Sequence, residues 1–249
     1  MPPFIDIHCH LTWPSIYSNL SEVIGNAEKA GVIMLTNGID KDSNRLSLEI
    51  SKKYSSVRAA IGLYPPDSVM EEKMVEEELS FIESQKDSIV AVGEIGLDYQ
   101  NIKDKEHQTP IFVHQLRLAK KIGKPVIIHS RKAEKEVITI LKSENMQKAL
   151  LHCFHGSKSL IKAAVESNFF FSISTNVTRS EQTQMLVSMV PLHLLFAETD
   201  SPFLSPFKDK ENQPAFVVES YKKIAEIKQV TIEELKNIIY MNWIGMFER

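Results

Sequence analysis

The chain alternates between short apolar runs of strand length and longer segments whose apolar residues recur at helical spacing. Eight such runs are present, at residues 4–8, 32–37, 58–63, 89–95, 125–129, 149–153, 169–174 and 194–199. Helices are predicted at residues 70–87, 106–123, 131–148 and 157–168, and Gly31 and Gly123 stand where helix-ending glycines are expected. This alternation is typical of parallel sheets built from βαβ units.

Eight strand–helix units point to an α/β fold of the (β/α)₈ TIM-barrel type. The runs are apolar on both faces, as expected for strands covered by helices outside and by one another inside. A length of 249 residues is typical of such a barrel as a single domain over residues 1–249. A doubly wound open sheet is the structural alternative, although it usually has fewer strands. Two terminal helices are expected at 214–229 and 231–249, the second with Thr231 and Glu234 spaced as a capping box.

Composition restricts the class of protein further. The 29 Lys and Arg residues against 32 Asp and Glu residues give a net charge of −3, which excludes a module that coats nucleic acid through its overall positive charge. Two cysteines are too few for a disulfide framework. The start MPPFIDIHCH does not look like a signal peptide, and no window reaches the roughly 18 apolar residues of a membrane span. We expect a cytoplasmic protein with no membrane contact and no obligate protein partner.

Histidines and acids stand at the carboxyl ends of the apolar runs, where barrel enzymes carry their chemistry. In the first run, FIDIHCH, strand alternation predicts that Asp6, His8 and His10 share one face and that Ile5, Ile7 and Cys9 share the other. The apolar set suits the helix-covered outside of a barrel. The two imidazoles are therefore predicted to face the barrel mouth, as a pair of nitrogen ligands for a metal ion.

Four further runs end in a residue of the same kind, and each is costly to bury unless it is paired or ligated. They are Glu94, His129, His152 and Asp200. Four imidazoles and two carboxylates offer enough ligands for two divalent ions, with Mg²⁺, Mn²⁺ and Zn²⁺ as candidates. Glu94 is the natural bridge, because a carboxylate can bind one ion through each oxygen. Two such ions would leave the centre at roughly +2, which suits a phosphate.

At these residues the sequence resembles the TatD family of metal-dependent deoxyribonucleases, a branch of the amidohydrolase-type barrels. The motifs that carry the resemblance are FIDIHCH at 4–10, GEIGLDY at 93–99, PVIIHSR at 125–131, LHCFHG at 151–156, ETDSP at 198–202 and NWIGMF at 242–247. They occur in the expected order and extend over nearly the whole chain.

The resemblance implies a two-metal phosphodiesterase that acts on DNA, commonly as a 3′ to 5′ exonuclease on single strands or 3′ ends. It implies one metal held by His8, His10, Glu94 and Asp200 and another by Glu94, His129 and His152. The chain differs from the family pattern at the end of the third strand. The family often reads GxHPH there, whereas this chain has GLYPP, with Tyr64 and Pro66 at the two histidine positions. Ile7 and Thr12 differ from the usual family residues as well. Because related members have been linked to deacylation of D-aminoacyl-tRNA, an ester or amide hydrolase is the alternative function.

In the expected mechanism a water molecule activated by the two ions attacks phosphorus. Asp200 would accept the proton of that water, and Glu94 would fix the separation of the ions. Arg131, two residues after His129, is expected either to grip phosphate oxygens or to form a surface salt bridge. Tyr99 is a candidate for stacking on a nucleobase. A third hypothesis is a catalytically silent barrel that acts as a binding protein. The intact set of metal ligands argues against it.

Other polar and aromatic residues are expected outside the chemistry. Asp6 would either orient His8 or bond a neighbouring backbone amide. Trp13, Phe154 and Phe203 also follow strand ends, and we expect ordinary packing for them rather than stacking on bases. Solvent-facing or capping positions are expected for His107, His114 and His193, a loop position for His155, and small packing roles for Cys9 and Cys153.

Overall fold

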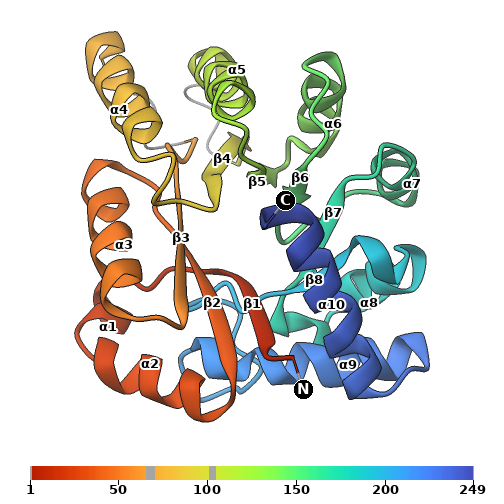
Figure 1. The fold of residues 1–249 in the computed structure, drawn as a ribbon. Helices are drawn as coiled ribbons and strands as arrows, with labels where there is room; N and C mark the ends of the chain where they lie inside the picture. The colour runs from red at the N-terminus through yellow and green to blue at the C-terminus, as the bar shows by residue number, and fades with distance from the viewer. Residues whose placement is uncertain (1, 66–70, 101–104, 249) are drawn as a thin grey trace.

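The computed structural model describes residues 2–65, 71–100 and 105–248, and it shows a barrel of parallel strands with helices around it (Figure 1). The strands are β1 (Phe4–Cys9), β2 (Val32–Asn37), β3 (Val57–Ile61), β4 (Ala91–Asp98), β5 (Val126–Arg131), β6 (Ala149–Leu151), β7 (Phe170–Ile173) and β8 (Leu195–Ala197). They are hydrogen-bonded in chain order from β1 to β8, without the reversal of a doubly wound sheet. The predicted (β/α)₈ fold is therefore confirmed.

Helices follow the strands and form the outer layer. They are α1 (Pro14–Tyr17), α2 (Leu20–Lys29), α3 (Lys41–Lys53), α4 (Glu72–Ser84), α5 (Lys105–Lys121), α6 (Glu134–Ser143), α7 (Lys158–Glu166), α8 (Glu181–Met189), α9 (Val217–Lys228) and α10 (Ile232–Phe247), with 3₁₀ helices η3 (Thr175–Thr178), η4 (Leu192–Leu194) and η5 (Pro214–Phe216). Among the helices in the described part of the chain, none combines the length and the apolar character needed to cross a bilayer.

The helix predicted at 131–148 begins too early. Arg131 is still the last residue of β5, and Lys132 has a left-handed backbone with φ of 53°, so α6 starts only at Glu134. The turn between them cannot be distinguished from a helix by apolar spacing. The predicted helix ends at Met70 and Arg249 lie outside the described residues.

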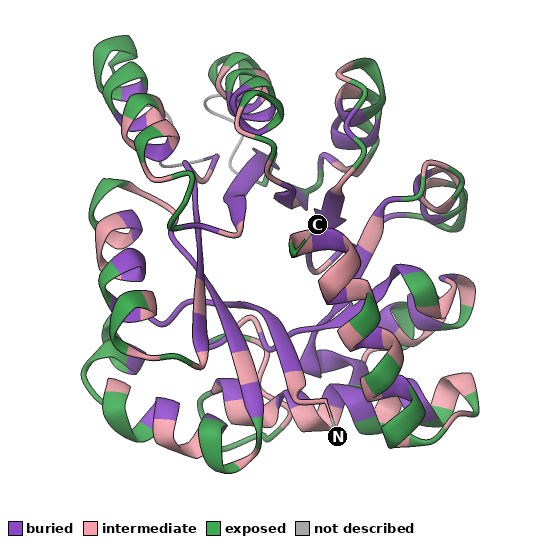
Figure 2. Cartoon of the chain, viewed as in Figure 1, coloured by how far each residue is buried: buried purple, intermediate pink, exposed green. Residues whose placement is uncertain are grey.

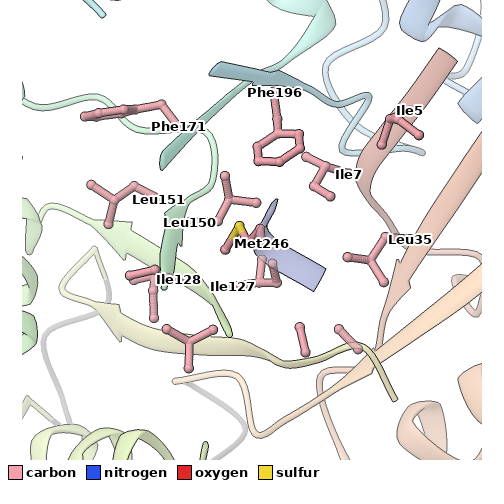
Figure 3. Packing of buried hydrophobic residues seen from close by; sticks show 14 of the residues in the cluster. Ile5, Ile7, Leu35, Ile127, Ile128, Leu150, Leu151, Phe171, Phe196 and Met246 are labelled. Carbon is pink, nitrogen blue, oxygen red and sulfur yellow. The ribbon is translucent and has the colours of Figure 1, made fainter. Parts of the chain in front are cut away.

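The core lies on both sides of the strands, which are buried along most of their length while the outer faces of the helices are exposed (Figure 2). Figure 3 shows Ile127, Leu150 and Phe196 pointing toward the middle of the barrel, together with Met246 from α10. Because aliphatic and aromatic side chains fill this space, the barrel is a packed core, and its polar groups are confined to its ends.

Helix α10 covers the amino-terminal end of the barrel. The side-chain amide of Asn242 donates to the carbonyl of Leu195 at the start of β8, at 2.9 Å, and Lys148, just before β6, donates to the carbonyl of Met246 at 3.1 Å. The expected capping box is present, with Thr231 and Glu234 each bonding the backbone N–H of the other. With this end covered, the carboxyl ends of the strands are the open face.

Separate hydrogen bonds join β1 to α9 and to the β8 segment, in place of a regular ladder. The Tyr221 hydroxyl of α9 accepts from the backbone N–H of Ile5 at 2.9 Å, and the Asp6 carboxylate accepts from both the backbone N–H and the hydroxyl of Thr199 at 2.8 and 2.6 Å. At the open end, the N–H of Asp200 donates to the carbonyl of His8 at 2.9 Å. These bonds close the barrel between its first and last strands.

The strict alternation predicted for FIDIHCH does not hold along β1. The register of β1 against β2 shifts between Asp6 and Cys9, so three steps on β1 face two on β2. Asp6 bonds Thr199 across the seam, and Figure 3 shows Ile7 pointing toward the middle of the apolar cluster, so Ile7 does not face outward with the predicted apolar set. A register shift changes which face a side chain occupies, and nothing in the apolar pattern signals it.

Strand β4 has a similar irregularity against β5, between Val92 and Ile95, which includes Glu94. Next to it, Gly96 has φ of 144° and lies so close to β5 that a Cβ atom there would be 2.0 Å from the His129 carbonyl oxygen. Only glycine allows this approach. The glycines of GEIG thus bring the strand that carries Glu94 directly against the strand that carries His129.

Candidate metal centre

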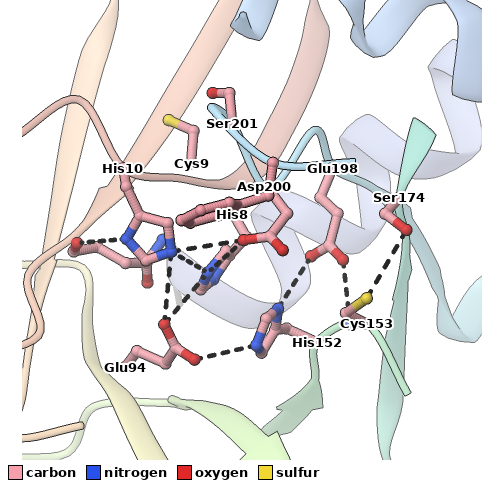
Figure 4. A network of polar contacts seen from close by, with 12 residues as sticks. His8, Cys9, His10, Glu94, His152, Cys153, Ser174, Glu198, Asp200 and Ser201 are labelled. Atoms are coloured by element: carbon pink, nitrogen blue, oxygen red, sulfur yellow. Dashed lines mark hydrogen bonds and ion pairs between the residues drawn. The ribbon is translucent and has the colours of Figure 1, made fainter. Parts of the chain in front are cut away.

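The structure brings all six sequence-predicted ligands together at the open end of the barrel. His8 lies in β1, Glu94 in β4 and His129 in β5, and the other three follow the ends of β1, β6 and β8, namely His10, His152 and Asp200. Figure 4 shows His8, His10, Glu94, His152 and Asp200 converging from different strands. Neighbouring parallel strands end at the same rim, which is why residues nearly two hundred positions apart in sequence meet here.

One group of ligand atoms comes from His8, His10 and Asp200. The Nε2 atoms of the two imidazoles are 3.2 Å apart, and they lie 3.6 and 3.4 Å from Oδ1 of Asp200. Oε2 of Glu94 lies 3.4 Å from Nε2 of His8 and 3.6 Å from Nε2 of His10. Two nitrogens and two oxygens thus surround one point.

A second group forms on the other side of Glu94. Its other oxygen, Oε1, lies 2.9 Å from Nδ1 of His129 and 3.0 Å from Nε2 of His152, and these two nitrogens are 3.1 Å apart. Each oxygen of the Glu94 carboxylate therefore faces a different pair of imidazoles. This is the arrangement expected of a carboxylate that bridges two cations.

The donor set fits divalent metal ions. Ring nitrogens at 3.1 to 3.2 Å from each other cannot both present lone pairs unless a cation lies between them or one carries a proton. Ligand atoms of His8, His10 and Asp200, and likewise of Glu94, His129 and His152, lie within 4.8 Å of one another and could hold a metal ion. Mixed imidazole and carboxylate ligands suit zinc, manganese and related ions.

The electrostatics of the centre favour cations. Burial alone would raise the pKa of Glu94, yet the imidazoles of His152 and His129 hold it well below its usual range, so the carboxylate stays charged. Burial would lower the pKa of His129 and His152, but the neighbouring carboxylates raise both. For His8, burial dominates and lowers the pKa. Protons and metal ions therefore compete for the same ring nitrogens.

Asp98 lies behind His129, and it was not singled out from the sequence. Its Oδ2 is 3.3 Å from Nε2 of His129 and accepts a hydrogen bond from the Tyr64 hydroxyl at 3.0 Å. A hydrogen bond from Nε2 fixes the tautomer in which Nδ1 is free to face Glu94. Asp98 stands within GEIGLDY but beyond the fourth predicted strand, and only the longer β4 of the structure, which ends at Asp98, places it beside His129.

Glu198 has the corresponding position behind His152 and was also missed. It is fully buried, accepts hydrogen bonds from the Cys153 N–H and the Ser172 hydroxyl, and lies 3.7 Å from Nδ1 of His152 (Figure 4). The motif ETDSP contains both Glu198 and Asp200, and the desolvation cost of a strand acid applies to each.

Tyr64 stands where the resemblance implies a histidine, and its hydroxyl enters this network. Besides its bond to Asp98, the hydroxyl is 3.4 Å from Nε2 of His129, and its ring packs edge-on against that imidazole at 4.8 Å between centroids. Pro66, at the other such position, lies outside the described residues.

Helix α5 holds the strand ends beneath these residues through two buried glutamines. Gln108 both accepts from the backbone N–H of Asp98 and donates to its carbonyl, at 2.9 and 3.0 Å. Gln115 does the same with Leu63, at 2.7 and 3.0 Å. These side-chain amides take the place of hydrogen bonds from a neighbouring strand at the points where β3 and β4 end. The backbone next to Tyr64 and at Asp98 is therefore held from outside the barrel.

For Asp6 the structure favours the second of the two predicted roles, a buried acid bonded to a backbone amide, through its bonds to Thr199. Arg131 is exposed at the end of β5, and Tyr99 is half-buried with the Lys105 ammonium 4.5 Å from its ring centroid. No ion pair of Arg131 is found among the described residues.

The remaining candidates separate by exposure. His107, His114 and His193 are exposed, as predicted, and His155 is exposed in the loop after β6. Phe154 is buried against Phe171 and Cys9 is buried within the core, so both pack as predicted. Trp13 and Phe203, for which packing was also expected, are instead exposed beside the centre.

A family model described as TatD related DNase matches residues 5–248 of the chain. The chain is 35% identical to an uncharacterized metal-dependent hydrolase of Methanocaldococcus jannaschii, with 99% of this chain and 97% of that protein covered. It is 33% identical to the deoxyribonuclease TATDN3 of Homo sapiens, with 98% and 94% covered.

Solved structures agree with these matches. A TatD homologue of Escherichia coli is 26% identical and superposes with a TM-score of 0.92, with 99% of this chain and 98% of that chain covered. A TatD family hydrolase of Entamoeba histolytica, at 23% identity, has a TM-score of 0.89 with the same coverage and shows the shared fold.

Proposed function

The chain belongs to the family of TatD-related DNases, and from this premise we propose that it hydrolyses phosphodiester bonds of DNA as a two-metal 3′ to 5′ exonuclease on single-stranded 3′ ends. The observation that carries the proposal is the Glu94 carboxylate, whose two oxygens face two different imidazole pairs. A carboxylate that offers one oxygen to each of two ions would hold them close together, as hydrolysis by two metal ions requires. We further propose that residues 1–249 act as one domain in the cytosol without an obligate protein partner.

In this proposal His8, His10, Glu94 and Asp200 hold one divalent ion, and Glu94, His129 and His152 hold the other. When bound, the ions supply a lowered pKa for the attacking water and stabilise charge on the attacking and leaving oxygens. Mg²⁺, Mn²⁺ and Zn²⁺ all suit these ligands. The chain itself contributes the spacing, because both carboxylate oxygens belong to one rigidly held Glu94.

Asp200 is proposed as the acceptor of the proton from the attacking water. Its side chain is 14% exposed, whereas that of Glu94 is 3% exposed, so Asp200 is the carboxylate that solvent reaches more readily. The neighbouring imidazoles of His10 and His152 hold its pKa below the usual value against the effect of burial, which keeps it ionised and able to take a proton.

Two residues are proposed to contact the substrate. The exposed guanidinium of Arg131 stands two residues after His129, at the rim of the centre, where it can bond two oxygens of a phosphate. Tyr99 lies one residue after β4 at the same rim, and its ring is proposed to contact a nucleobase.

The test is an activity screen of the purified protein with each of Mg²⁺, Mn²⁺ and Zn²⁺. The substrates are single-stranded DNA labelled at its 5′ end, a chromogenic phosphodiester, and D-aminoacyl-tRNA with simpler aminoacyl esters. We expect stepwise shortening of the DNA from its 3′ end, and loss of that activity in Glu94→Ala.

Hydrolysis of the aminoacyl esters alone would instead assign the centre to an ester hydrolase, since polarising a carbonyl uses the same groups. If no substrate is cleaved with any metal and no metal is bound, the proposal is wrong, and a barrel that binds without catalysis is favoured.

A further inference from the structure

Two aromatic side chains lie exposed in contact with each other beside the centre. Trp13 is 38% and Phe203 is 42% exposed, and their rings meet edge to face with centroids 4.9 Å apart. The Phe203 ring also approaches the His10 imidazole, at 6.3 Å between centroids. A single exposed aromatic residue needs no explanation, but a pair that touches a predicted metal ligand is a candidate for ligand contact.

Both rings are attached to the ligands by the same kind of turn. The backbone N–H of Trp13 donates to the carbonyl of His10 at 3.1 Å, and the N–H of Phe203 donates to the carbonyl of Asp200 at 2.9 Å. Each aromatic residue therefore follows a predicted ligand by three positions, and a backbone bond fixes its distance from that ligand. The two turns also meet, since the N–H of His10 donates to the carbonyl of Ser201 at 2.9 Å.

Buried polar groups hold Phe203 outward, without packing of its own ring into the core. The side-chain amide of the fully buried Asn212 donates to the carbonyls of Phe203 and Thr199, at 2.6 and 2.8 Å. The Thr175 hydroxyl donates to the carbonyl of Leu204 at 2.7 Å, where the backbone is left-handed with φ of 57°. Buried hydrogen bonds thus hold the loop backbone, so little of it has to be ordered when a ligand binds at the exposed ring.

Trp13 is held in the same way. It stands immediately before α1, and its carbonyl accepts from the N–H of Tyr17 at 2.8 Å. The Ser15 hydroxyl of that helix donates to Glu211 of the opposite loop at 2.7 Å, so the two segments that carry the rings are joined a second time. The pair therefore forms a preorganised apolar surface on the β1–β8 side of the centre.

We propose that Trp13 and Phe203 form a stacking surface for the base of the 3′-terminal nucleotide of a single-stranded DNA. This inference rests on the proposed function, because the phosphate joined to that nucleotide would lie at the His8, His10 and Asp200 group. A nucleotide carries both an anionic group and a flat aromatic face, and these are what the centre and the ring pair offer side by side. Stacking accepts every base, so the surface suits an exonuclease with little sequence preference.

The first experiment measures stacking without turnover. A single-stranded oligonucleotide carries fluorescent 2-aminopurine as its 3′-terminal base, joined by a phosphorothioate that resists hydrolysis, and its fluorescence is followed as protein is added with Mg²⁺. We expect quenching by the wild-type protein, and a dissociation constant raised roughly 5- to 150-fold in Phe203→Ala and in Trp13→Ala. Phe203→Tyr retains a flat ring and should retain the quenching.

Phe207→Ala is the matched control. Phe207 has the same exposed fraction as Phe203, 42%, and lies in the same loop, but its ring contacts Phe216 at 4.9 Å instead of His10. We expect wild-type quenching in this variant. Equal weakening in Phe203→Ala and Phe207→Ala, or no quenching by the wild-type protein, would overturn the inference.

A second measurement separates this inference from the proposed function. It compares kcat/KM for two oligonucleotides, one with a normal 3′-terminal base and one with an abasic 3′ terminus. The preference for the normal base, given as the ratio of the two kcat/KM values, should fall roughly 5- to 150-fold in Phe203→Ala. An unchanged ratio would refute the stacking surface even if DNA is hydrolysed. Quenching that depends on Phe203, without hydrolysis of either substrate, would support the surface and refute the nuclease.

Discussion

The carboxylate of Glu94 is the residue on which the geometry of the centre depends, because each of its oxygens faces a separate pair of imidazoles. Three of the four imidazoles have an oxygen atom behind their second nitrogen, whereas Nδ1 of His8 has no hydrogen-bond partner among the described residues. His10 has the Asn37 carbonyl, His129 has Asp98, and His152 has Glu198 at a longer distance. The Asn37 carbonyl and the Asp98 carboxylate thus decide which ring nitrogen of His10 and of His129 points at the centre.

Replacement of Asp200 by Asn tests its role as proton acceptor. The amide keeps the shape of the side chain but cannot take a proton at neutral pH, so kcat should fall by at least about 100-fold. Circular dichroism and the melting temperature, both measured with a chelator present, should change little, because the side chain lies at the rim of the barrel. Unaltered nuclease activity would remove Asp200 from the mechanism.

Replacement of Asp98 by Asn tests its role in positioning His129. The amide can present its NH₂ group to Nε2 and so favour the wrong tautomer, and we expect metal affinity at the Glu94, His129 and His152 group to fall roughly 10- to 100-fold. Calorimetric titration with Mn²⁺ or Zn²⁺ measures this directly.

The matched control for Asp98 is the exposed Asp87→Asn, which should bind metal like the wild-type protein. Tyr64→Phe removes one hydrogen bond to Asp98 and should have a smaller effect than Asp98→Asn. Wild-type metal affinity in Asp98→Asn would show that packing alone orients His129.

At the scale of the elements, irregular strand pairing aims the ligands. The register shifts in β1 and β4 include His8 and Glu94, respectively. Shifts of this kind redirect side chains near active sites. Helix α5 then fixes the end of β4 through Gln108, and α9 fixes β1 through Tyr221. The ligands are therefore placed by how neighbouring elements bond to one another, beyond the fact that each stands at a strand end.

Tyr221→Phe tests the bond by which α9 holds β1 at the seam where the barrel closes. The change leaves the buried N–H of Ile5 without its acceptor, and we expect a loss of about 1–3 kcal/mol in the free energy of unfolding. Urea denaturation followed by circular dichroism measures it. The half-buried Tyr240 of α10 provides the control, and Tyr240→Phe should be close to neutral. Equal stability of the two variants would mean that the Tyr221 hydroxyl does not support the seam.

At the scale of the whole molecule, charge is divided between surface and centre. The chain carries a net charge of −3, yet two bound divalent ions would place a charge of about +4 at the open end, against the carboxylates of Glu94, Asp98, Glu198 and Asp200 in and behind the ligand set. The covered amino end, with α10 across it, leaves the carboxyl rim as the face where an anionic substrate meets that charge. Overall composition therefore does not exclude a polyanion as substrate.

Metal binding should stabilise the whole fold, because strands from around the barrel contribute ligands. Stabilisation follows the free concentration of ion relative to its dissociation constant, and amounts to about 2.7 kcal/mol at a hundredfold excess. Differential scanning calorimetry with excess Mn²⁺ or Zn²⁺ should therefore show a higher melting temperature than with a chelator. Glu94→Ala should lose most of this difference. A melting temperature independent of metal in the wild-type protein would contradict ion binding at the centre.

The sequence predicted the eight strand positions and the six polar residues that meet at their ends, because both depend on local properties. Strand length, apolar runs and the cost of burying a charge are properties of short segments. Glu198 lies within the eighth predicted strand and meets the same criterion, whereas Asp98 lies beyond the end of the fourth predicted strand. Trp13 and Phe203 were expected to pack, but they are exposed. No property of a short segment distinguishes an aromatic residue packed under a loop from one held outward.

By itself, then, the sequence determined the barrel fold with its eight strand–helix units, the end of the barrel at which the polar residues gather, and the types of those residues. Tertiary structure decided which ring nitrogen of each histidine faces Glu94, which of the acids lie behind the imidazoles, and the exposure of the aromatic pair. These depend on register shifts, on side chains such as Asp6, Gln108 and Asn212 that bond distant backbone, and on the closure of β1 against the β8 segment. Such contacts join residues far apart in the chain, and no pattern within a short segment records them.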